Sequence, residues 1–427
     1  MPHPAGSSAV SAREAFRQAR RHLPPSLAVS GKLIGRGAVE ESAEGCRVAL
    51  SDGRTALDFG SYAVTLLGHR HPAVVAAVRD QLDRLPTASR SLVNPVAAVA
   101  AACLVDYLGG GHDRVYFGLN GTDAVEAAVK LARMATGRTR VVAVEGGYHG
   151  KSLGALALTH HHRYRAGLDD LLAGVVHVPA DDADAVRRTI GDGAVAAVLF
   201  EPVQGENGVR PLDVEVLRRW CADAHAHGAF VIADEIQSGL RRCGERSVAL
   251  AAGLPVDAIL LGKPLGGGVL PLSAVVCDER LYAPLIKDPL VHTGTFAGHP
   301  LACAALPAAL AAVEDLAHRG EHIAREMAER LAGVRERWPT LVTGVRGQGL
   351  LWGLDLASPH LTGQLILELA HAGLLVSPCM SRPETLRLLP PLVSRDTDVA
   401  EAFRVLDAAL ARLPVGGVGK GHTTGGD

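Results

Sequence analysis

Short apolar runs alternate with longer amphipathic stretches along most of this chain. The apolar runs predict buried strands at residues 114–117, 141–144, 195–200, 230–233, 258–261 and 272–276. The amphipathic patterns predict helices, among them residues 122–134, 215–227 and 300–317. Because strands and helices alternate, we expect an α/β fold with a mostly parallel sheet covered by helices.

The rhythm changes near residue 313. Beyond it the pattern predicts helices at 321–338, 361–371 and 398–413 and a strand at 350–354. We therefore expect a large domain at 61–312, a smaller α+β domain at 313–414, and an N-terminal segment, 1–60, that packs with the small domain. The Ser/Ala/Pro/Arg-rich lead-in to about residue 30 is predicted to be soft, and residues 415–427 are predicted to be a disordered tail.

Charge and cysteine content exclude several classes of function. The chain has 427 residues, with 43 Lys and Arg against 45 Asp and Glu, a net charge of −2. This argues against a partner held by bulk charge, such as nucleic acid or an anionic membrane. The longest apolar stretch, 96–105, is shorter than the ~20 residues of a membrane span, and the N-terminus lacks the apolar segment of a secretory signal. We expect a cytoplasmic protein.

Metal sites are not predicted either. The seven cysteines are an odd number without a C-x-x-C pair, which fits neither a disulfide framework nor a Cys-rich zinc site. His160 to His162 and Asp181 to Asp184 lack partners at ligand spacing, so solvated loops are expected there. Arg241 and Arg242 are expected at a site rim, as a solvated or interface pair. Glycine is enriched: 48 of the 427 residues, about 11%, are glycine, against a typical ~7%. This predicts many sharp turns.

Lys263 follows the predicted strand 258–261 and precedes the glycines 266–268. Open α/β sheets bind ligands at the carboxyl ends of their strands. Partial burial there would lower the pKa of the lysine and supply a free amine for a Schiff base. Taken alone, a lysine in a solvent-facing turn explains the same pattern better.

Asp234 ends the apolar run 230–233 and is followed by Glu235. A carboxylate at this place could keep a heteroaromatic nitrogen protonated, as an Asp does beside pyridoxal phosphate. Two adjacent acids could also bind magnesium or cap a helix. A nucleotide–magnesium site would need a phosphate-binding P-loop, and the G-x-x-x-x-G-K-[ST] pattern does not occur.

Two further strand ends add a phosphate anchor and an aromatic ring. Asn120, Gly121 and Thr122 follow strand 114–117 and open a helix, where backbone N–H groups can bind phosphate and where the same residues can simply cap the helix. Tyr148 lies on a glycine-flanked loop, which lets a ring stack on a planar ligand, although a single such Tyr is more often structural. Jointly, an anchor, a ring, an acid and an amine are the inventory of a pyridoxal phosphate (PLP) site.

At these residues the sequence resembles the class III aminotransferases, PLP-dependent enzymes of fold type I, over about residues 45–413. The resemblance is carried by these motifs: Asn120-Gly121-Thr122, Tyr148-His149-Gly150, Glu201-Pro202-Val203-Gln204-Gly205-Glu206, Asp234-Glu235-Ile236-Gln237, Lys263 before Gly266-Gly267-Gly268, and Thr295-Phe296 with Pro300-Leu301-Ala302-Cys303.

The resemblance implies roles for the cofactor-binding residues. Lys263 would form the Schiff base and then act as acid and base in the proton shift. Asp234 would pair with the pyridinium nitrogen and Gln237 would bond the phenolic oxygen. Tyr148 and Ile236 would stack on the two faces of the ring, and Gly121 and Thr122 would bind the phosphate. Their motif neighbours Asn120 and His149 are also implied at the cofactor. Thr295 would reach the phosphate from a partner subunit. That last contact implies a homodimer with shared active sites.

Four residues bear on the substrate. Glu206 and Arg387 match a gate that many family members use. In it the glutamate covers the arginine when a carboxylate-free amine binds, and it swings away when a 2-oxo acid binds. In proteins in general, such a pair is more often an ordinary salt bridge. The gate implies a ping-pong cycle with glutamate and 2-oxoglutarate. Lys151 stands where ornithine, acetylornithine and 4-aminobutyrate relatives carry an arginine, and its local motif is most similar to putrescine aminotransferase. Tyr62 instead matches a substrate-contacting tyrosine of ornithine aminotransferase. The longer match, to putrescine aminotransferase, carries more weight, so a diamine or other carboxylate-free amine is the leading substrate class.

The leading hypothesis is thus an aminotransferase acting on a putrescine- or ornithine-like ω-amine or its aldehyde or ketone. Departures from the family pattern, Leu119-Asn120, Asp123 and His299, suggest a divergent member, and a tailoring enzyme that aminates a natural-product ketone or aldehyde is an alternative. An aminomutase or epimerase would keep the cofactor and change the reaction. A non-catalytic binding subunit is the alternative of another class, and the joint presence of Lys263, Asp234 and Gln237 counts against it.

Overall fold

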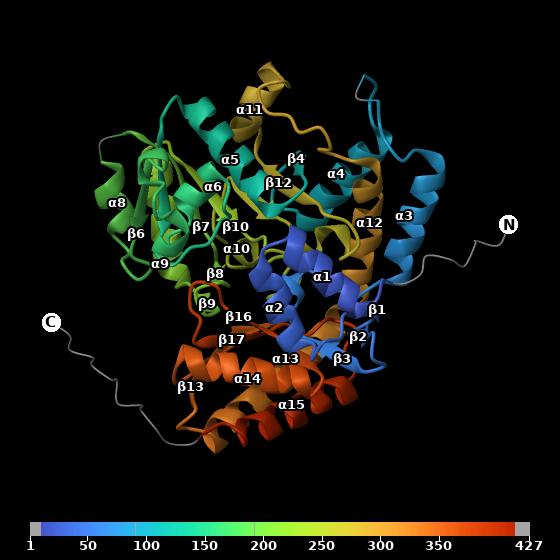
Figure 1. Cartoon of the computed structure of the whole chain (residues 1–427). Helices are drawn as coiled ribbons and strands as arrows, with labels where there is room; N and C mark the ends of the chain where they lie inside the picture. The colour runs from blue at the N-terminus through green and yellow to red at the C-terminus, as the bar shows by residue number, and fades with distance from the viewer. Residues whose placement is uncertain (1–9, 90, 192, 415–427) are drawn as a thin grey trace.

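A seven-stranded sheet forms the centre of the large domain (Figure 1). The computed structural model describes residues 10–89, 91–191 and 193–414. In spatial order the strands are β4 (Arg114–Gly118), β12 (Ser273–Cys277), β11 (Ala258–Leu261), β10 (Phe230–Asp234), β7 (Val195–Phe200), β5 (Arg140–Val144) and β6 (Val175–Val178). The pairs from β11 to β6 are parallel, whereas β12 runs antiparallel to both of its neighbours. The predicted mostly parallel α/β sheet is confirmed.

Both faces of this sheet are buried, which is why its strands read as continuous apolar runs. In β10, Val231 and Ala233 belong to one core cluster and Phe230 and Ile232 to the other, as the two-residue period of a strand requires. α5 (Gly121–Thr136) packs on the second face through its buried alanines and valines. The strand β6 escaped prediction because His177 interrupts its apolar run.

The small domain is built on an antiparallel sheet. Its strands, in spatial order, are β13 (Val342–Gln348), β14 (Leu351–Leu356), β17 (Thr385–Leu388) and β16 (Ser377–Pro378). Its helices are α13 (Ala317–Arg337), α14 (Pro359–His371) and α15 (Asp396–Leu410). The sequence pattern pointed to only one of these strands, because β16 is very short and β13 carries two glycines.

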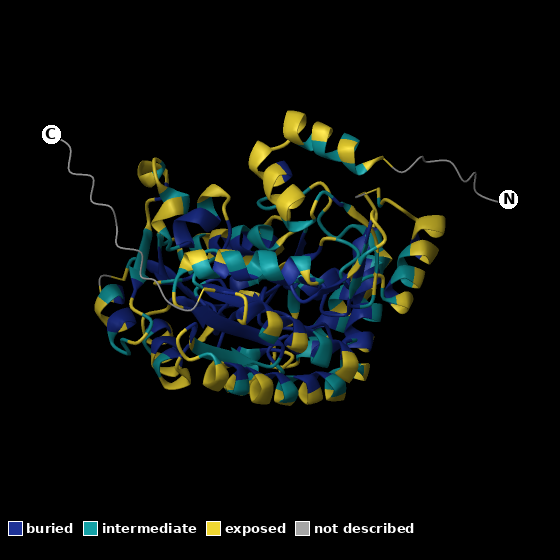
Figure 2. Cartoon of the chain, turned by 60° about the horizontal axis from the view of Figure 1, so that its bottom comes forward, coloured by how far each residue is buried: buried dark blue, intermediate teal, exposed yellow. Residues whose placement is uncertain are grey.

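The N-terminal residues join the small domain through a second sheet. Its strands are β1 (Glu40–Glu44), β2 (Arg47–Leu50), β3 (Thr55–Asp58) and β15 (Leu374–Leu375), and β3 pairs in parallel with β15. The predicted soft lead-in is wrong over its described part, since α1 (Ala12–His22) and α2 (Pro25–Ile34) are helices. Ser11 caps α1 by accepting a hydrogen bond from the Glu14 amide at 3.3 Å. Both helices remain largely exposed (Figure 2). The predicted tail, 415–427, lies outside the described residues.

The other elements connect these layers. They are η1 (Ser61–Ala63), α3 (Pro72–Arg84), α4 (Pro95–Leu108), α6 (Leu153–Leu158), α7 (His162–Arg165), η2 (Asp169–Leu171), α8 (Ala185–Ile190), β8 (Val203–Gln204), β9 (Arg210–Pro211), α9 (Val214–Ala226), α10 (Val248–Ala251), η3 (Lys263–Gly266), α11 (Glu279–Lys287) and α12 (Pro300–Asp315). Within the described ranges no single helix is long and apolar enough to cross a membrane; α12 and α13 pass that test only as a pair, bent by 57°.

The arginine pair at 241–242 departs from expectation. Arg242 is buried and donates to the carbonyl oxygens of Leu350 and Pro390 at 3.2 and 3.0 Å. It therefore ties the large domain to the small one and is not a solvated rim residue. Arg241 is partly buried and forms an ion pair with Glu314, with its Nε 2.9 Å from the carboxylate. The solvated alternative is thus wrong for Arg242, because two adjacent charges give no sequence signal of burial.

The polar clusters at 160–162 and 181–184 serve local structure. The His161 ring accepts a hydrogen bond from the Arg163 amide at the start of α7, and the His160 ring lies 5.1 Å from that of His177. Asp184 forms ion pairs with arginines of α8 and α9.

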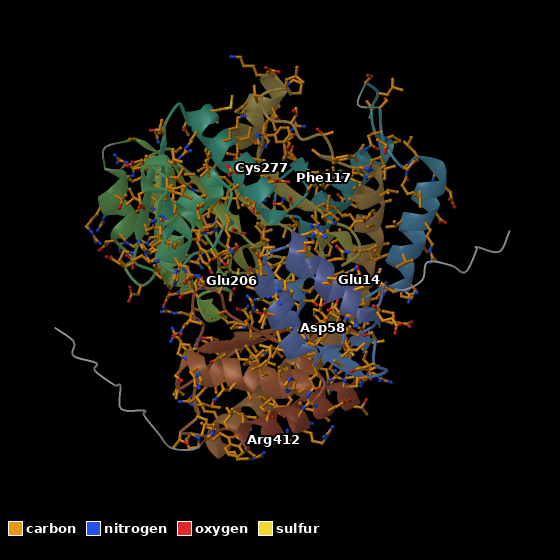
Figure 3. All side chains as sticks on the ribbon, in the orientation of Figure 1. Glu14, Asp58, Phe117, Glu206, Cys277 and Arg412 are labelled. Carbon is orange, nitrogen blue, oxygen red and sulfur yellow. The ribbon has the colours of Figure 1, made fainter. Side chains whose placement is uncertain are left out.

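Side chains fill the space between the two domains, and Glu206 is labelled there in Figure 3.

Candidate active site

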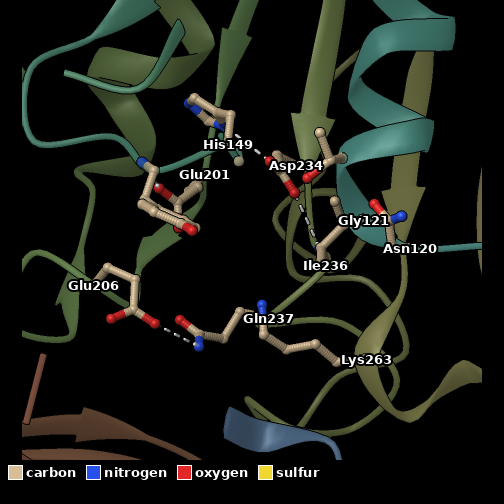
Figure 4. Close-up of a pocket in the computed structure, with 12 residues that line it drawn as sticks. Asn120, Gly121, His149, Glu201, Glu206, Asp234, Ile236, Gln237 and Lys263 are labelled. Atoms are coloured by element: carbon tan, nitrogen blue, oxygen red, sulfur yellow. Dashed lines mark hydrogen bonds and ion pairs between the residues drawn. The ribbon is translucent and has the colours of Figure 1, made fainter. Parts of the chain in front are cut away.

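The predicted strand-end residues meet in one cavity of about 310 Å³ at the carboxyl edge of the large sheet. Its lining residues are Asn120, Gly121, Thr122, Tyr148, His149, Gly150, Glu201, Glu206, Asp234, Ile236, Gln237 and Lys263 (Figure 4). Nine of the twelve were expected at the cofactor and one, Glu206, at the substrate; Glu201 and Gly150 had no assigned role. The cavity forms because parallel strands end at the same edge.

Lys263 stands at the start of η3, two residues after β11 ends. Its φ of 40° lies in the left-handed region that non-glycine residues rarely adopt. Burial lowers the pKa of its ammonium group, so the neutral amine is more accessible than in water. Backbone strain at a side chain that lines a cavity is a feature of functional sites.

Asp234, at the end of β10, is buried and paired with His149. The carboxylate Oδ2 lies 2.7 Å from Nδ1 of His149, and Oδ1 accepts the Ile236 amide at 3.2 Å. Burial by itself would lower the pKa of His149, but the hydrogen bond and charge of Asp234 outweigh it and raise that pKa. His149 therefore orients the Asp234 carboxylate through this hydrogen bond.

The N-terminus of α5 provides a site for an anion. Asn120 accepts the Asp123 amide at 3.2 Å, while the Asp123 carboxylate accepts the amides of Leu119 and Asn120 at 2.9 and 3.3 Å. Two of the residues that depart from the family pattern, Asn120 and Asp123, thus form a capping box. Gly150, with φ 124°, is required nearby, because a Cβ there would come within 2.4 Å of the Thr122 hydroxyl.

Glu201 is the cavity residue to which the sequence reasoning gave no role. Its carboxylate accepts the Tyr148 amide at 2.8 Å and the Gly205 amide at 3.4 Å. Burial raises its pKa to about 7. It joins the loop that carries Tyr148 to the loop that carries Glu206. The signal was available, since Glu201 follows the strand 195–200 as Asp234 follows its own strand.

Glu206 and Arg387 form a buried ion pair. The Glu206 carboxylate also accepts the Met380 amide at 2.9 Å and the Gln237 side-chain amide at 3.3 Å. Burial would raise the pKa of Glu206, but the charge of Arg387 outweighs it and the pKa is lowered. The arginine comes from β17 of the small domain, so the pair spans the domain junction.

Lys151 and Tyr62 are both exposed, and neither lines the cavity. The Nζ of Lys151 is 4.4 Å from the ring centroid of Tyr164 and 5.8 Å from that of Tyr148, a cation–π geometry. Tyr62, on η1, is 64% exposed. Tyr164 was not singled out from the sequence.

Thr295 is the one cofactor residue that a single chain does not bring to the cavity. It is exposed and does not line the pocket, and its neighbour Phe296 is 51% exposed. Its role from a partner subunit remains a prediction.

The cavity suits PLP in charge and shape. Asp234 offers a buried anion, α5 offers first-turn amides, and Lys263 offers a buried amine. Gly121 keeps the space open, since a Cβ there would lie 2.9 Å from the Ile236 side chain.

Comparison with known proteins defines the class. Residues 35–410 match the aminotransferase class-III family. The chain is 35% identical to an acetylornithine aminotransferase of Gloeobacter violaceus over 421 residues, which cover 95% of this chain and 99% of that one. It is 29% identical to the crystal structure of ornithine aminotransferase from Toxoplasma gondii ME49, with a TM-score of 0.85 and coverage of 94% and 95%. Another structure of the Toxoplasma enzyme, also 29% identical with a TM-score of 0.85 and covering 95% and 96%, is described with partial occupancy of PLP at its active site.

This chain belongs to the class III aminotransferases. It is a PLP-dependent transaminase of fold type I, as the resemblance implied.

Proposed function

We propose that the enzyme transfers an amino group between glutamate and the terminal amine of an ornithine-like amino acid, by a ping-pong cycle. The observation that carries this proposal is the buried pair of Glu206 and Arg387 at the cavity. A transaminase site that must admit both a carboxylate and a side-chain amine needs a cation that can be covered and uncovered.

The cavity residues have separate tasks. When bound, PLP supplies the electron sink that lets an amino group pass between substrates. Asp234, with His149 behind it, would hold the protonated ring nitrogen, and Gln237 would approach the phenolic oxygen. Gly121 and Thr122 would bind the phosphate through the α5 N-terminus. Lys263 would hold the cofactor and carry a proton at its Nζ, for which the lowered pKa suits it.

The gate divides the two half-reactions. With Glu206 on Arg387 the pair carries no net charge, and an amine without a nearby carboxylate can approach. With Glu206 displaced, Arg387 can bind a carboxylate of glutamate or 2-oxoglutarate with two parallel hydrogen bonds. A buried arginine left without a partner is costly, so the exchange is most favourable when one carboxylate replaces the other.

Lys151 favours an amino acid over a diamine. Its ammonium group lies beside Tyr148 and Tyr164, where it would repel the distal ammonium of putrescine and attract the distal carboxylate of an ornithine-type substrate. The likeness to an acetylornithine aminotransferase supports the same substrate class. A lysine makes a point-charge contact and lacks the fork of the arginine in those relatives.

We further propose that the active enzyme is a homodimer with Thr295 of each subunit completing the other's phosphate site. Support comes from exposed apolar side chains in the segment that carries Thr295, where Leu290 is 78% and Phe296 51% exposed.

Half-reactions followed by cofactor absorbance test the proposal. Glutamate should convert the enzyme to its amino form, and ornithine and N-acetylornithine should do so faster than putrescine. Failure with glutamate would refute glutamate-dependent transamination. A faster reaction with putrescine would refute only the role of Lys151 and return the substrate to the diamine class. Light scattering against protein concentration tests the dimer.

A further inference from the structure

Tyr164 lies on the short helix α7, outside every motif that identifies the family. Its Oη donates to the carbonyl oxygen of Met380 at 3.0 Å. Its ring lies edge-on to that of Tyr148, with centroids 6.2 Å apart, and Lys151 lies over it. It therefore connects the large domain to the small-domain segment that follows β16.

That segment holds Glu206 through two amides. The Met380 N–H donates to the Glu206 carboxylate at 2.9 Å, and the Ser381 N–H donates to the Glu206 main-chain carbonyl at 3.1 Å. The carbonyl that accepts from Tyr164 belongs to the same peptide group as the Ser381 N–H. A hydrogen bond to a peptide carbonyl polarises its N–H and strengthens the bond that it donates. The Tyr164 hydroxyl thus strengthens the Ser381 contact to the Glu206 main chain, and it positions the Met380 residue whose amide binds the Glu206 carboxylate.

We propose that the Tyr164–Met380 hydrogen bond is a latch that holds Glu206 over Arg387 and so sets how readily the enzyme admits a dicarboxylate. This inference rests on the proposed function. Tyr164 is a positioning residue, because it acts through Met380 and Ser381 and does not touch Glu206. Displacing Glu206 gives up its bond to the Met380 amide, so the latch stabilises the closed arrangement.

The test is Tyr164→Phe, which removes the hydroxyl and keeps the ring beside Lys151 and Tyr148. One neutral hydrogen bond shifts such an equilibrium by about 2- to 10-fold. The holoenzyme variant should bind glutarate, an unreactive dicarboxylate, about 2- to 10-fold more tightly by calorimetry, because apparent affinity follows the open fraction. The KM for 2-oxoglutarate should fall by a similar factor, while the KM for the amine substrate and kcat stay unchanged.

Tyr282→Phe is the matched control. The Tyr282 hydroxyl also donates to a main-chain carbonyl, that of Val115 at 3.1 Å, in the large domain away from the cavity. This variant should leave glutarate binding unchanged. In a Glu206→Ala background there is no carboxylate to hold, so adding Tyr164→Phe should have no further effect on glutarate affinity, as a double-mutant cycle would show.

The latch is overturned if Tyr164→Phe binds glutarate as wild type does, if neither protein binds it, or if the gain persists without Glu206. Equal changes in the KM of both half-reactions would also overturn it, since they indicate a general structural effect. Glutarate binding needs no turnover, so it separates the latch from the proposed function. That function fails on its own if wild-type enzyme is not converted by glutamate.

Discussion

The floor of the site, defined as Lys263, Asp234 and His149, differs from the gate, Glu206 and Arg387, in how it is held. The floor groups belong to the ends of adjacent strands or to a loop of one sheet, and Asp234 lies level with Leu260 in the pairing of β10 with β11. The gate pairs a large-domain loop with β17 of the small domain. The floor is thus built within one domain, whereas the gate depends on how two domains meet. Under the proposed function, the chemistry rests on groups of one domain and the substrate choice on a contact between two.

Lys263→Ala is the variant of the floor for which we expect the largest effect. We expect turnover to fall by more than about 10⁴-fold, because the variant loses both the amine that holds the cofactor and the proton carrier. Steady-state assays with both substrates measure this, and Lys287→Ala, at an exposed position of α11, is the control. Residual turnover near the wild-type rate would exclude Lys263 from the reaction.

Asp234→Asn should have the next largest effect on turnover. It removes the anion at the floor and leaves His149 without its charged partner, so both half-reactions should slow by about 10²- to 10³-fold. Single-turnover absorbance measures each half-reaction. Asp278→Asn, which weakens the cap of α11 and the ion pair of Asp278 with Arg280 away from the cavity, should be close to wild type. A loss confined to one substrate would contradict an assignment to the floor.

Arg387→Met tests the gate. The glutamate half-reaction should lose about 10²-fold or more in kcat/KM, since a buried charged contact is worth about 2–5 kcal/mol. The amine half-reaction should change far less, because the amine does not use the guanidinium. An equal loss for both substrates would show that Arg387 is structural.

The smallest effect concerns Glu201, which joins the loops of floor and gate. Its pKa is raised to about 7 in the folded protein from 4.5. The folded state therefore holds this proton more tightly than the unfolded state, and the stability from it is present below about pH 4.5 and lost as the pH rises through about 7. Glu201→Gln should gain unfolding free energy relative to wild type by about 1–3 kcal/mol between pH 5 and 8. Denaturant unfolding of both proteins at pH 5 and at pH 8 measures this gain. A difference in unfolding free energy that does not change with pH would contradict the raised pKa of Glu201.

How much the sequence could predict follows the same division. Lys263, Asp234 and Tyr148 could be found because each follows an apolar strand of a parallel sheet. Glu201 shared that signal without receiving a role. Tyr164 and Arg242 gave no such signal in the sequence, because their partners lie far along the chain. Tyr164 contacts Met380, and Arg242 contacts Leu350 and Pro390.

By itself the sequence determined the mostly parallel sheet, the strand-end groups and the family, since these depend on periodicity and short motifs. Only the tertiary structure decided that Arg242 is buried between domains, that α1 and α2 are helical, and that Glu206 is closed on Arg387 with the Met380 amide as a further partner. The physical reason is that local pattern specifies which face of an element is buried, whereas contacts between domains depend on how distant elements pack.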